Sequence, residues 1–250
     1  RACRAGVIDD FFNESPHQWT VNGGSWQIIN RFQCTPSWSH MAGESPDGMA
    51  ALWHKTIFSG DIVVEFYAGT RQGWYDRPGD LNCTIMASTT SPSRGYTVTC
   101  CEYDYNLSQN WSTLYRQGEV MARSEKYTVP RRRAGLVRKY MDPLIAEGRP
   151  VHGAWYYIKL RKIGNRLEYW FDNELVFSTE DPETLQQGLV GIWTYIHSMT
   201  LAQVKITFQE ARPRPMAVRR LPAGTAPAPP AAAPATAAVP AAAASPAPTA

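Results

Sequence analysis

The sequence predicts an all-β protein, an antiparallel sandwich or barrel built from short strands. Apolar and polar side chains alternate with a period of two in many separate runs, as they do in strands that bury one face. Asp61–Ala68 is the clearest run. The others are Leu81–Ser88, Tyr96–Tyr105, Trp155–Lys162, Arg166–Phe171, Leu189–His197 and Leu201–Phe208. Helical periodicity is weak outside Ala134–Ile145, which Pro143 interrupts, so the fold class is all-β.

Turn residues separate these runs. They are Gly69, Pro78-Gly79, Ser93-Arg94-Gly95, Gly164-Asn165, Asp172-Asn173 and Gly188. The best-specified hairpin runs from Tyr156–Leu160 through Gly164-Asn165 into Arg166–Phe171, and Asp172-Asn173 then leads to Leu175–Phe177. Gly, Asn and Asp tolerate the positive φ that a tight hairpin turn requires.

Composition divides the chain at about residue 210. Residues 1–210 carry the strand pattern and suffice for one sandwich domain. Residues 211–250 become almost purely Ala, Pro and Thr, which predicts a disordered tail or linker suited to tethering the domain to a wall or a second module. No stretch is apolar for long enough to span a bilayer. The abrupt start at Arg1 is typical of a processed chain, so we expect a secreted, periplasmic or cell-surface protein.

Composition also narrows the classes of partner. The 25 basic and 22 acidic residues give a net charge of +3, too mild a balance for a protein whose main partner is nucleic acid. Nine Trp and twelve Tyr suit strands, and flat aromatic rings also suit the faces of sugars. The cysteines show no spacing typical of zinc, and the histidines are too scattered for a catalytic metal. We therefore expect no metal and no cofactor.

Several segments resemble one family of sandwich domains. Residues 165–177 read NRLEYWFDNELVF, residues 181–184 read DPET, residues 188–198 read GLVGIWTYIHS, and residues 79–83 read GDLNC. These motifs are similar to those of bacterial concanavalin A-like lectin/glucanase sandwich domains, in the uncharacterised DUF6250/DUF1080-like group found with polysaccharide-degradation genes. The resemblance implies an antiparallel two-sheet jelly-roll sandwich that handles carbohydrate on the concave face of one sheet, and it names no reaction.

The strongest candidate binding set lies in a single run. Alternation places Trp193, Tyr195 and His197 on one strand face, where a Trp platform beside a hydroxyl and an imidazole suits a pyranose ring. The alternative is that these three side chains fill the core. We favour the exposed face because the opposite face already carries the aliphatic residues Val190, Ile192 and Ile196.

Polar and acidic side chains occur in two further sets. Asp80 and Asn82 stand at the start of a strand, where their side chains either point into a groove or form hydrogen bonds that stabilise the preceding turn. Glu102 and Asp104 would lie about 7 Å apart on one strand face. Retaining laminarinase-type glucanases carry a second Glu in such a run, but Asn106 follows here. The run therefore lacks the proton donor, which would have to come from another strand, for example from Glu65 or Glu168.

A lyase on an acidic polysaccharide would need other groups, namely a cation or amide beside the uronate carboxylate and a Tyr or His as base and acid. The side chains that could take these roles are Asn82, Tyr103, Tyr115, Arg116 and His197. The basic run Arg131–Arg133 is interpreted instead as part of a solvated loop. Taken together, the candidate catalytic residues are His197, Asp80, Asn82, Tyr103, Arg116 and Glu102, and the candidate sugar-binding residues are Trp193, Tyr195, Trp111 and Tyr115.

Three functions remain open from the sequence. The first is an extracellular carbohydrate-active enzyme that acts on a polysaccharide as a lyase or glycoside hydrolase. The second is a non-catalytic carbohydrate-binding module, and the third is a structural or adhesion domain. A groove that joins Asp80, His197 and Arg116 would favour the enzyme, whereas a shallow surface of Trp and Tyr would favour binding alone.

Overall fold

The structure, a computed structural model of the 250-residue chain, describes residues 3–12, 17–30, 39–70, 80–103, 110–124 and 155–215. Contacts group Arg1–Arg214 into one compact unit and Pro215–Ala250 into another. The last strand ends at Pro213, and the tail predicted for residues 211–250 lies outside the described residues from 216 onward. The predicted helical stretch at 134–145 and the basic run at 131–133 also lie outside them. In the part of the chain that is described, no helix is long and apolar enough to cross a membrane.

Strands occupy almost every described segment. In chain order they are β1 (Cys3–Asp10), β2 (Trp19–Val21), β3 (Ser25–Asn30), β4 (Ser39–Glu44), β5 (Met49–His54), β6 (Thr56–Thr70), β7 (Asn82–Ala87), β8 (Tyr96–Tyr103), β9 (Asn110–Arg116), β10 (Glu119–Ser124), β11 (Tyr156–Ile163), β12 (Arg166–Phe171), β13 (Glu174–Glu180), β14 (Gln187–Tyr195) and β15 (Ser198–Pro213). A short 3-10 turn, Pro92–Arg94, lies between β7 and β8.

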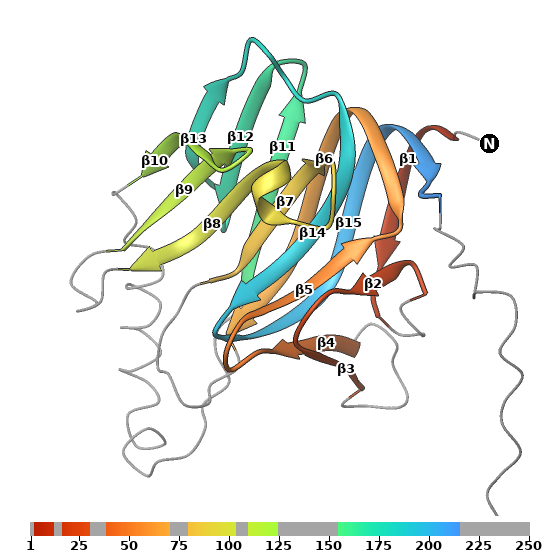
Figure 1. Ribbon diagram of the computed structural model, residues 1–250, viewed down its shortest axis with the longest axis vertical. Coiled ribbons are helices and arrows are strands. Elements are labelled where there is room, and N and C mark those ends of the chain that lie inside the picture. The colour runs from red at the N-terminus through yellow and green to blue at the C-terminus, as the bar shows by residue number, and fades with distance from the viewer. Residues whose placement is uncertain are drawn as a thin grey trace, which may run out of the picture. The chain divides into compact units, whose positions relative to one another are not determined.

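The strands form two sheets, which we call sheet A and sheet B (Figure 1). Sheet B has the order β10-β9-β8-β7-β14-β5-β2. Sheet A has the order β13-β12-β11-β6-β15, with β1 and β4 along the other side of β15 and β3 beyond β4. The first residues of β14 also pair with β6, so the two sheets are joined along one side. Every pairing among the described strands is antiparallel, and the predicted all-β, two-sheet class is confirmed.

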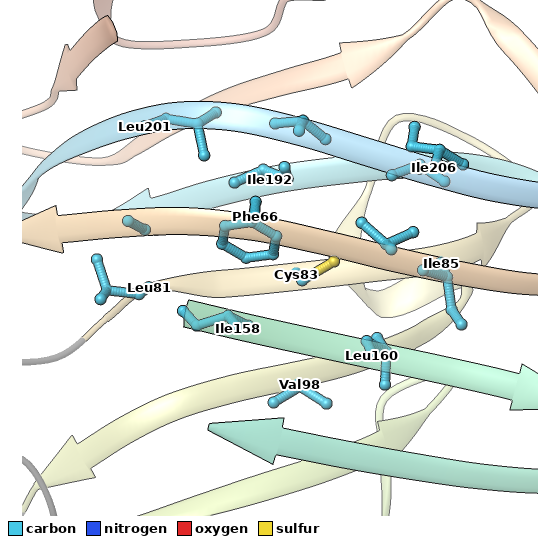
Figure 2. Close-up of a cluster of buried hydrophobic side chains, with 14 of the residues drawn as sticks. Phe66, Leu81, Cys83, Ile85, Val98, Ile158, Leu160, Ile192, Leu201 and Ile206 are labelled. Atoms are coloured by element: carbon cyan, nitrogen blue, oxygen red, sulfur yellow. The ribbon is translucent and has the colours of Figure 1, made fainter. Parts of the chain in front are cut away.

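The hydrophobic core lies between the sheets. Figure 2 shows Phe66 and Leu160 from sheet A pointing into the same space as Cys83 and Ile192 from sheet B. All four side chains are at most 1% exposed. Cys83 is a free thiol, and burial raises its pKa, so it acts in this core as a small apolar group.

Strand β6 shows how alternation builds this core. Its inward residues Ile62, Val64, Phe66 and Ala68 are buried, whereas Tyr67 on the outward side is 43% exposed. This is the pattern that the sequence predicts for a strand with one buried face.

The hairpins from β11 to β13 follow the predicted turns. Ile163 pairs with Arg166 across Gly164, which has a φ of +57°. The next turn places Asp172 and Asn173 at φ values of +48° and +65°, as a tight turn between antiparallel strands requires. The outward faces of the two sheets, set by these pairings, carry the side chains considered below.

Candidate functional site

The Asp80 carboxylate lies where the start of β7 meets the end of β14, in sheet B. Its Oδ1 accepts a hydrogen bond of 2.6 Å from the Asn82 side-chain amide, and its Oδ2 accepts one of 2.7 Å from the Tyr195 main-chain N–H. The Thr194 hydroxyl donates a longer bond, 3.4 Å, to the same oxygen. Residues far apart in the sequence therefore converge on one carboxylate.

The GDLNC segment folds in this way because its polar side chains bind the main chains of neighbouring strands. The Asp80 N–H donates to the Cys100 carbonyl at 2.8 Å, and Asn82 Oδ1 accepts the Cys100 N–H at 3.0 Å. Asp80 has a φ of +58°, a conformation that Asp adopts more readily than most residues. Asp80 and Asn82 thus hold β7, β8 and β14 together at one end of sheet B.

His197 completes this group of polar side chains, which we call the Asp80 cluster: Asp80, Asn82, Tyr195 and His197. It is 8% exposed and lies in the bend after β14. Its Nδ1 lies 2.8 Å from the Ser198 nitrogen and 2.9 Å from the Ser198 carbonyl oxygen, and its own carbonyl accepts the Ser45 N–H at 3.1 Å. The contacts with Ser198 orient the imidazole, and its electrostatic effect on the Asp80 carboxyl joins it to the cluster.

The surroundings of Asp80 raise the pKa of its carboxyl above the ordinary value. Burial raises the pKa of this carboxyl, because the charged form loses hydration. The hydrogen bonds from Asn82 and Tyr195 and the proximity of His197 act in the opposite direction without cancelling the effect of burial. Asp80 is therefore a candidate for a group that holds and donates a proton.

The predicted row of Trp193, Tyr195 and His197 is interrupted in the structure. Trp193 is only 8% exposed and packs beside Trp53, and its indole N–H donates to the Thr84 hydroxyl at 3.0 Å. Tyr195 is 54% exposed, and β14 ends there, so His197 does not continue the strand. The exposed aromatic surface expected along this row is present at Tyr195.

The core assignment of the opposite face holds for part of that face. Val190 and Ile192 are fully buried, as expected, but Ile196 is 42% exposed. The reason is that Ile196 follows the end of β14 and adopts a φ of +47°, so strand alternation no longer decides its direction.

Arg116 does not join the Asp80 cluster. Its Nε lies 2.7 Å from Asp181 Oδ2, and Asp181 also accepts a hydrogen bond from the Tyr96 hydroxyl. Arg116 pairs with Tyr96 at the start of β8, whereas Asp80 bonds to Cys100, four residues or about 13 Å further along that strand. The structure places Arg116 in an ion pair that ties β9 to the loop before β14.

The remaining candidates lie on β8 and β9. Trp111 and Tyr115 share the outward face of sheet B with Thr113, and the Arg123 guanidinium stacks 4.0 Å above the Trp111 ring. Glu102 pairs with Trp111 in the strand register, but the side chains of Glu102 and Tyr103 lie outside the described residues. Their predicted roles, like those of Trp111 and Tyr115, stay predictions.

Sequence reasoning missed the contribution of β14 to the Asp80 cluster. Thr194 was not among the candidate residues, and a main-chain N–H such as that of Tyr195 leaves no signal in a sequence. Only the register of β14 against its neighbours shows that both groups reach Asp80. Among the described residues, no group of three or more His, Cys, Asp or Glu side chains is placed to hold a metal ion.

Comparison with known proteins shows one family match. Residues 44–204 match the family described as a domain of unknown function, DUF6250. No curated protein matches the sequence.

Solved structures are similar to this chain at low sequence identity. A protein of unknown function with a galectin-like fold from Bacillus subtilis is 13% identical, with a TM-score of 0.53 over 85% of this chain and 100% of that one. The carbohydrate-binding module CBM66 from Bacillus subtilis is 16% identical, with a TM-score of 0.48 over 75% of this chain and 94% of that one. The galectin-like structure supports the two-sheet sandwich.

Proposed function

This chain belongs to the DUF6250 family, and we propose that it engages a polysaccharide at the Asp80 end of sheet B. The observation that carries the proposal is the convergence of the Asp80 carboxylate and the Asn82 amide at one end of sheet B. An exposed tyrosine ring lies beside them, and His197 is close enough to act electrostatically on the carboxyl. A pyranose has apolar faces and a polar rim, so it is recognised by an aromatic ring together with hydrogen-bonding groups. We place the protein among concanavalin A-like sandwiches that work outside the cytoplasm, with the tail as a tether.

The finer proposal is acid–base chemistry on the polysaccharide, as a lyase or a glycoside hydrolase. Asp80 is suited to act as the general acid because burial raises its pKa and because it lies beside the exposed Tyr195. His197 is suited to act as its partner, since it lies close enough to bias the charge of the Asp80 carboxylate. The exposed ring of Tyr195 would hold the sugar over these two groups.

Two observations favour a second candidate function, carbohydrate binding without catalysis. The Asp80 carboxylate already accepts three hydrogen bonds, as a purely structural carboxylate would. Arg116, the cation that a lyase would use beside a uronate, is paired with Asp181 instead.

The experiment that separates these functions is a screen of the full chain against laminarin, xylan, alginate and polygalacturonate. The release of reducing ends and the ultraviolet absorbance of unsaturated uronates would be recorded together. A rise in both signals indicates a lyase, and reducing ends alone indicate a hydrolase. Retention of the protein in gels that contain one of these polysaccharides, with neither signal, indicates binding alone. A silent protein that no gel retains would contradict the proposal.

Variants then test the location of the site. Tyr195→Ala removes an exposed ring without disturbing the main-chain bond to Asp80, and we expect it to weaken binding about tenfold. Asp80→Asn is expected to lower any turnover by two orders of magnitude or more, on the order of what general acids contribute. Glu180→Gln, at an exposed position of β13, is the matched control for the loss of a carboxylate.

A further inference from the structure

A hollow of about 560 Å³ lies on the outward face of sheet A, on the other sheet from the Asp80 cluster. Strands β6, β11 and β15 form its floor, and the turn between β12 and β13 contributes to its rim. The side chains that matter for its chemistry are Glu65, Tyr67, Trp155, Tyr157, Asp172 and Lys205. The function proposed above uses none of them.

Aromatic rings line this hollow and remain open to solvent. Tyr67 and Tyr157 are direct partners across β6 and β11, with ring centroids 5.3 Å apart and planes inclined by 48°. Tyr67 and Trp155 are each 43% exposed, although large aromatic side chains on a sheet normally bury most of their surface. The Tyr67 and Tyr157 rings lie side by side, and Trp155 lines the same hollow, so the aromatic side chains form an open surface.

Polar groups surround the platform in fixed positions. The Tyr157 hydroxyl donates to Glu65 Oε1, and Lys205 Nζ lies 4.0 Å from Glu65 Oε2. The Tyr157 main-chain N–H donates to Asp172 Oδ1 at 2.9 Å. Burial and the neighbouring Glu65 both raise the pKa of Tyr157, so its hydroxyl keeps its proton and stays a donor.

The charges around the hollow select among classes of ligand. The lining carboxylates Glu65 and Asp172 stand against the ammonium of Lys205. Lys159 is the cross-strand partner of Glu65 on β11, so the charges of this face nearly balance. Such a surface offers no net positive charge to attract a uronate or sulfated chain. A quaternary ammonium group is also disfavoured, because Lys205 occupies the carboxylate side of the platform and the rings do not enclose a cation.

We propose that this hollow is a second sugar-binding site, which takes a neutral segment of a glycan stacked on Tyr67 and Trp155. The apolar faces of the sugar would lie on the rings, and its hydroxyls would meet the carboxylate of Glu65 and the ammonium of Lys205 at the rim. The inference stands on residues separate from those of the Asp80 cluster, so either site can fail without the other.

The test is retention of the full chain in gels that contain xyloglucan, galactomannan, laminarin or polygalacturonate. We expect at least one of the three neutral polysaccharides to retain the wild-type protein. Tyr67→Ala and Trp155→Ala should each weaken that retention about tenfold, and Tyr67→Phe, which keeps the ring, should retain most of it. Leu175→Ala, which removes an exposed apolar side chain of β13 that lines neither the hollow nor the Asp80 cluster, is the control and should leave retention unchanged.

Four outcomes would overturn the inference. In the gels, these are a wild type that no neutral polysaccharide retains, equal retention of the wild type and both alanine variants, or an effect of the variants seen with polygalacturonate alone. The fourth is a change in intrinsic fluorescence when tetramethylammonium is added, with no such change for any glycan. Thermal unfolding of each variant shows whether the variant is folded. If one alanine variant is unstable, the other still tests the inference. Loss in Tyr195→Ala with no loss in Tyr67→Ala or Trp155→Ala would leave the Asp80 cluster as a binding site and remove this one.

Discussion

The outward faces of the two sheets use aromatic side chains in opposite ways. On sheet B, Trp53 is fully buried and Trp193 is 8% exposed, and both belong to a packed cluster with small and aliphatic neighbours. On sheet A, Tyr67 and Trp155 are each 43% exposed. Both sets stand on or beside strands, so the difference comes from what lies next to each ring.

The neighbours of Trp53 explain its burial. Gly191 is its partner across the strand pair, and a Cβ at Gly191 would meet the Trp53 ring at 2.7 Å. Glycine lets the ring lie flat on the sheet, and Trp193 closes it from the next position. The partner of Tyr67 is instead another ring, Tyr157, and the two rings are inclined by 48°, which leaves Tyr67 partly exposed. Alternation thus assigns a residue to a face, and its cross-strand partner decides whether it is exposed.

The largest expected effect follows directly from this difference. Trp53→Ala should lower the free energy of unfolding by about 3–5 kcal/mol, since it leaves a cavity in a packed layer. Tyr67→Ala should cost less than about 1 kcal/mol, because that ring is half exposed. Urea unfolding of both variants measures the two costs, and equal costs would show that the two faces are not packed differently.

An acid titration tests the burial of His54, which lies on the inward side of sheet B. Burial, with a smaller contribution from Lys55, lowers the pKa of His54 to about 4 from 6.5. Its Nδ1 accepts the Thr56 N–H, which fits a neutral ring. The unfolded chain therefore binds the proton first, so stability is full above about pH 6.5 and is lost as the pH falls toward 4, by about 3 kcal/mol in all.

Urea unfolding at pH 7 and pH 4.5 measures this loss. His54→Gln removes the titrating group, and the variant should therefore lose less stability than the wild type between the two values. His17→Gln, at an exposed position, is the control and should follow the wild type. An identical acid loss in wild type and His54→Gln would mean that His54 is not buried in its neutral form.

Removal of the Arg116–Asp181 ion pair should have a smaller effect on stability and no effect on polysaccharide retention. Burial alone would raise the pKa of Asp181, but hydrogen bonds from Tyr96, the Glu183 N–H and Arg116 lower it. Asp181→Asn should therefore cost about 1–3 kcal/mol of stability while leaving polysaccharide retention intact. Thermal unfolding and gel retention measure the two properties. Loss of retention without loss of stability would indicate that Arg116 belongs to the sugar site, as the sequence predicted.

Period-two alternation and turn residues predicted the sandwich well where one face of a strand is buried and the other is exposed to solvent. The alternation of β6 and the hairpins around Gly164 and Asp172 appear in the structure as expected. Strand β5 (Met49–His54) gave no alternation, because Trp53 and its neighbours bury the outward face as well. Burial of both faces erases the period-two signal.

The candidate site was predictable only in part, for a similar reason. Asp80 and Asn82 are neighbours in sequence, and their pairing could be anticipated from the turn and strand around them. The partner of Arg116 is Asp181, 65 residues away, and no local pattern reports such a contact. The hollow on sheet A was missed because Glu65, Tyr67 and Tyr157 become one surface only through strand register.

The measurement that tests the central claim most directly is a titration of the labelled full chain, followed through its backbone amide resonances. The titrant is an oligosaccharide of the polysaccharide that the protein retains or degrades. We predict that the Tyr195 amide, which donates to Asp80, and its neighbour Thr194 shift and saturate with the bound sugar. Shifts that leave both amides unchanged while the sugar is bound elsewhere would contradict the assignment of the polysaccharide site to the Asp80 cluster.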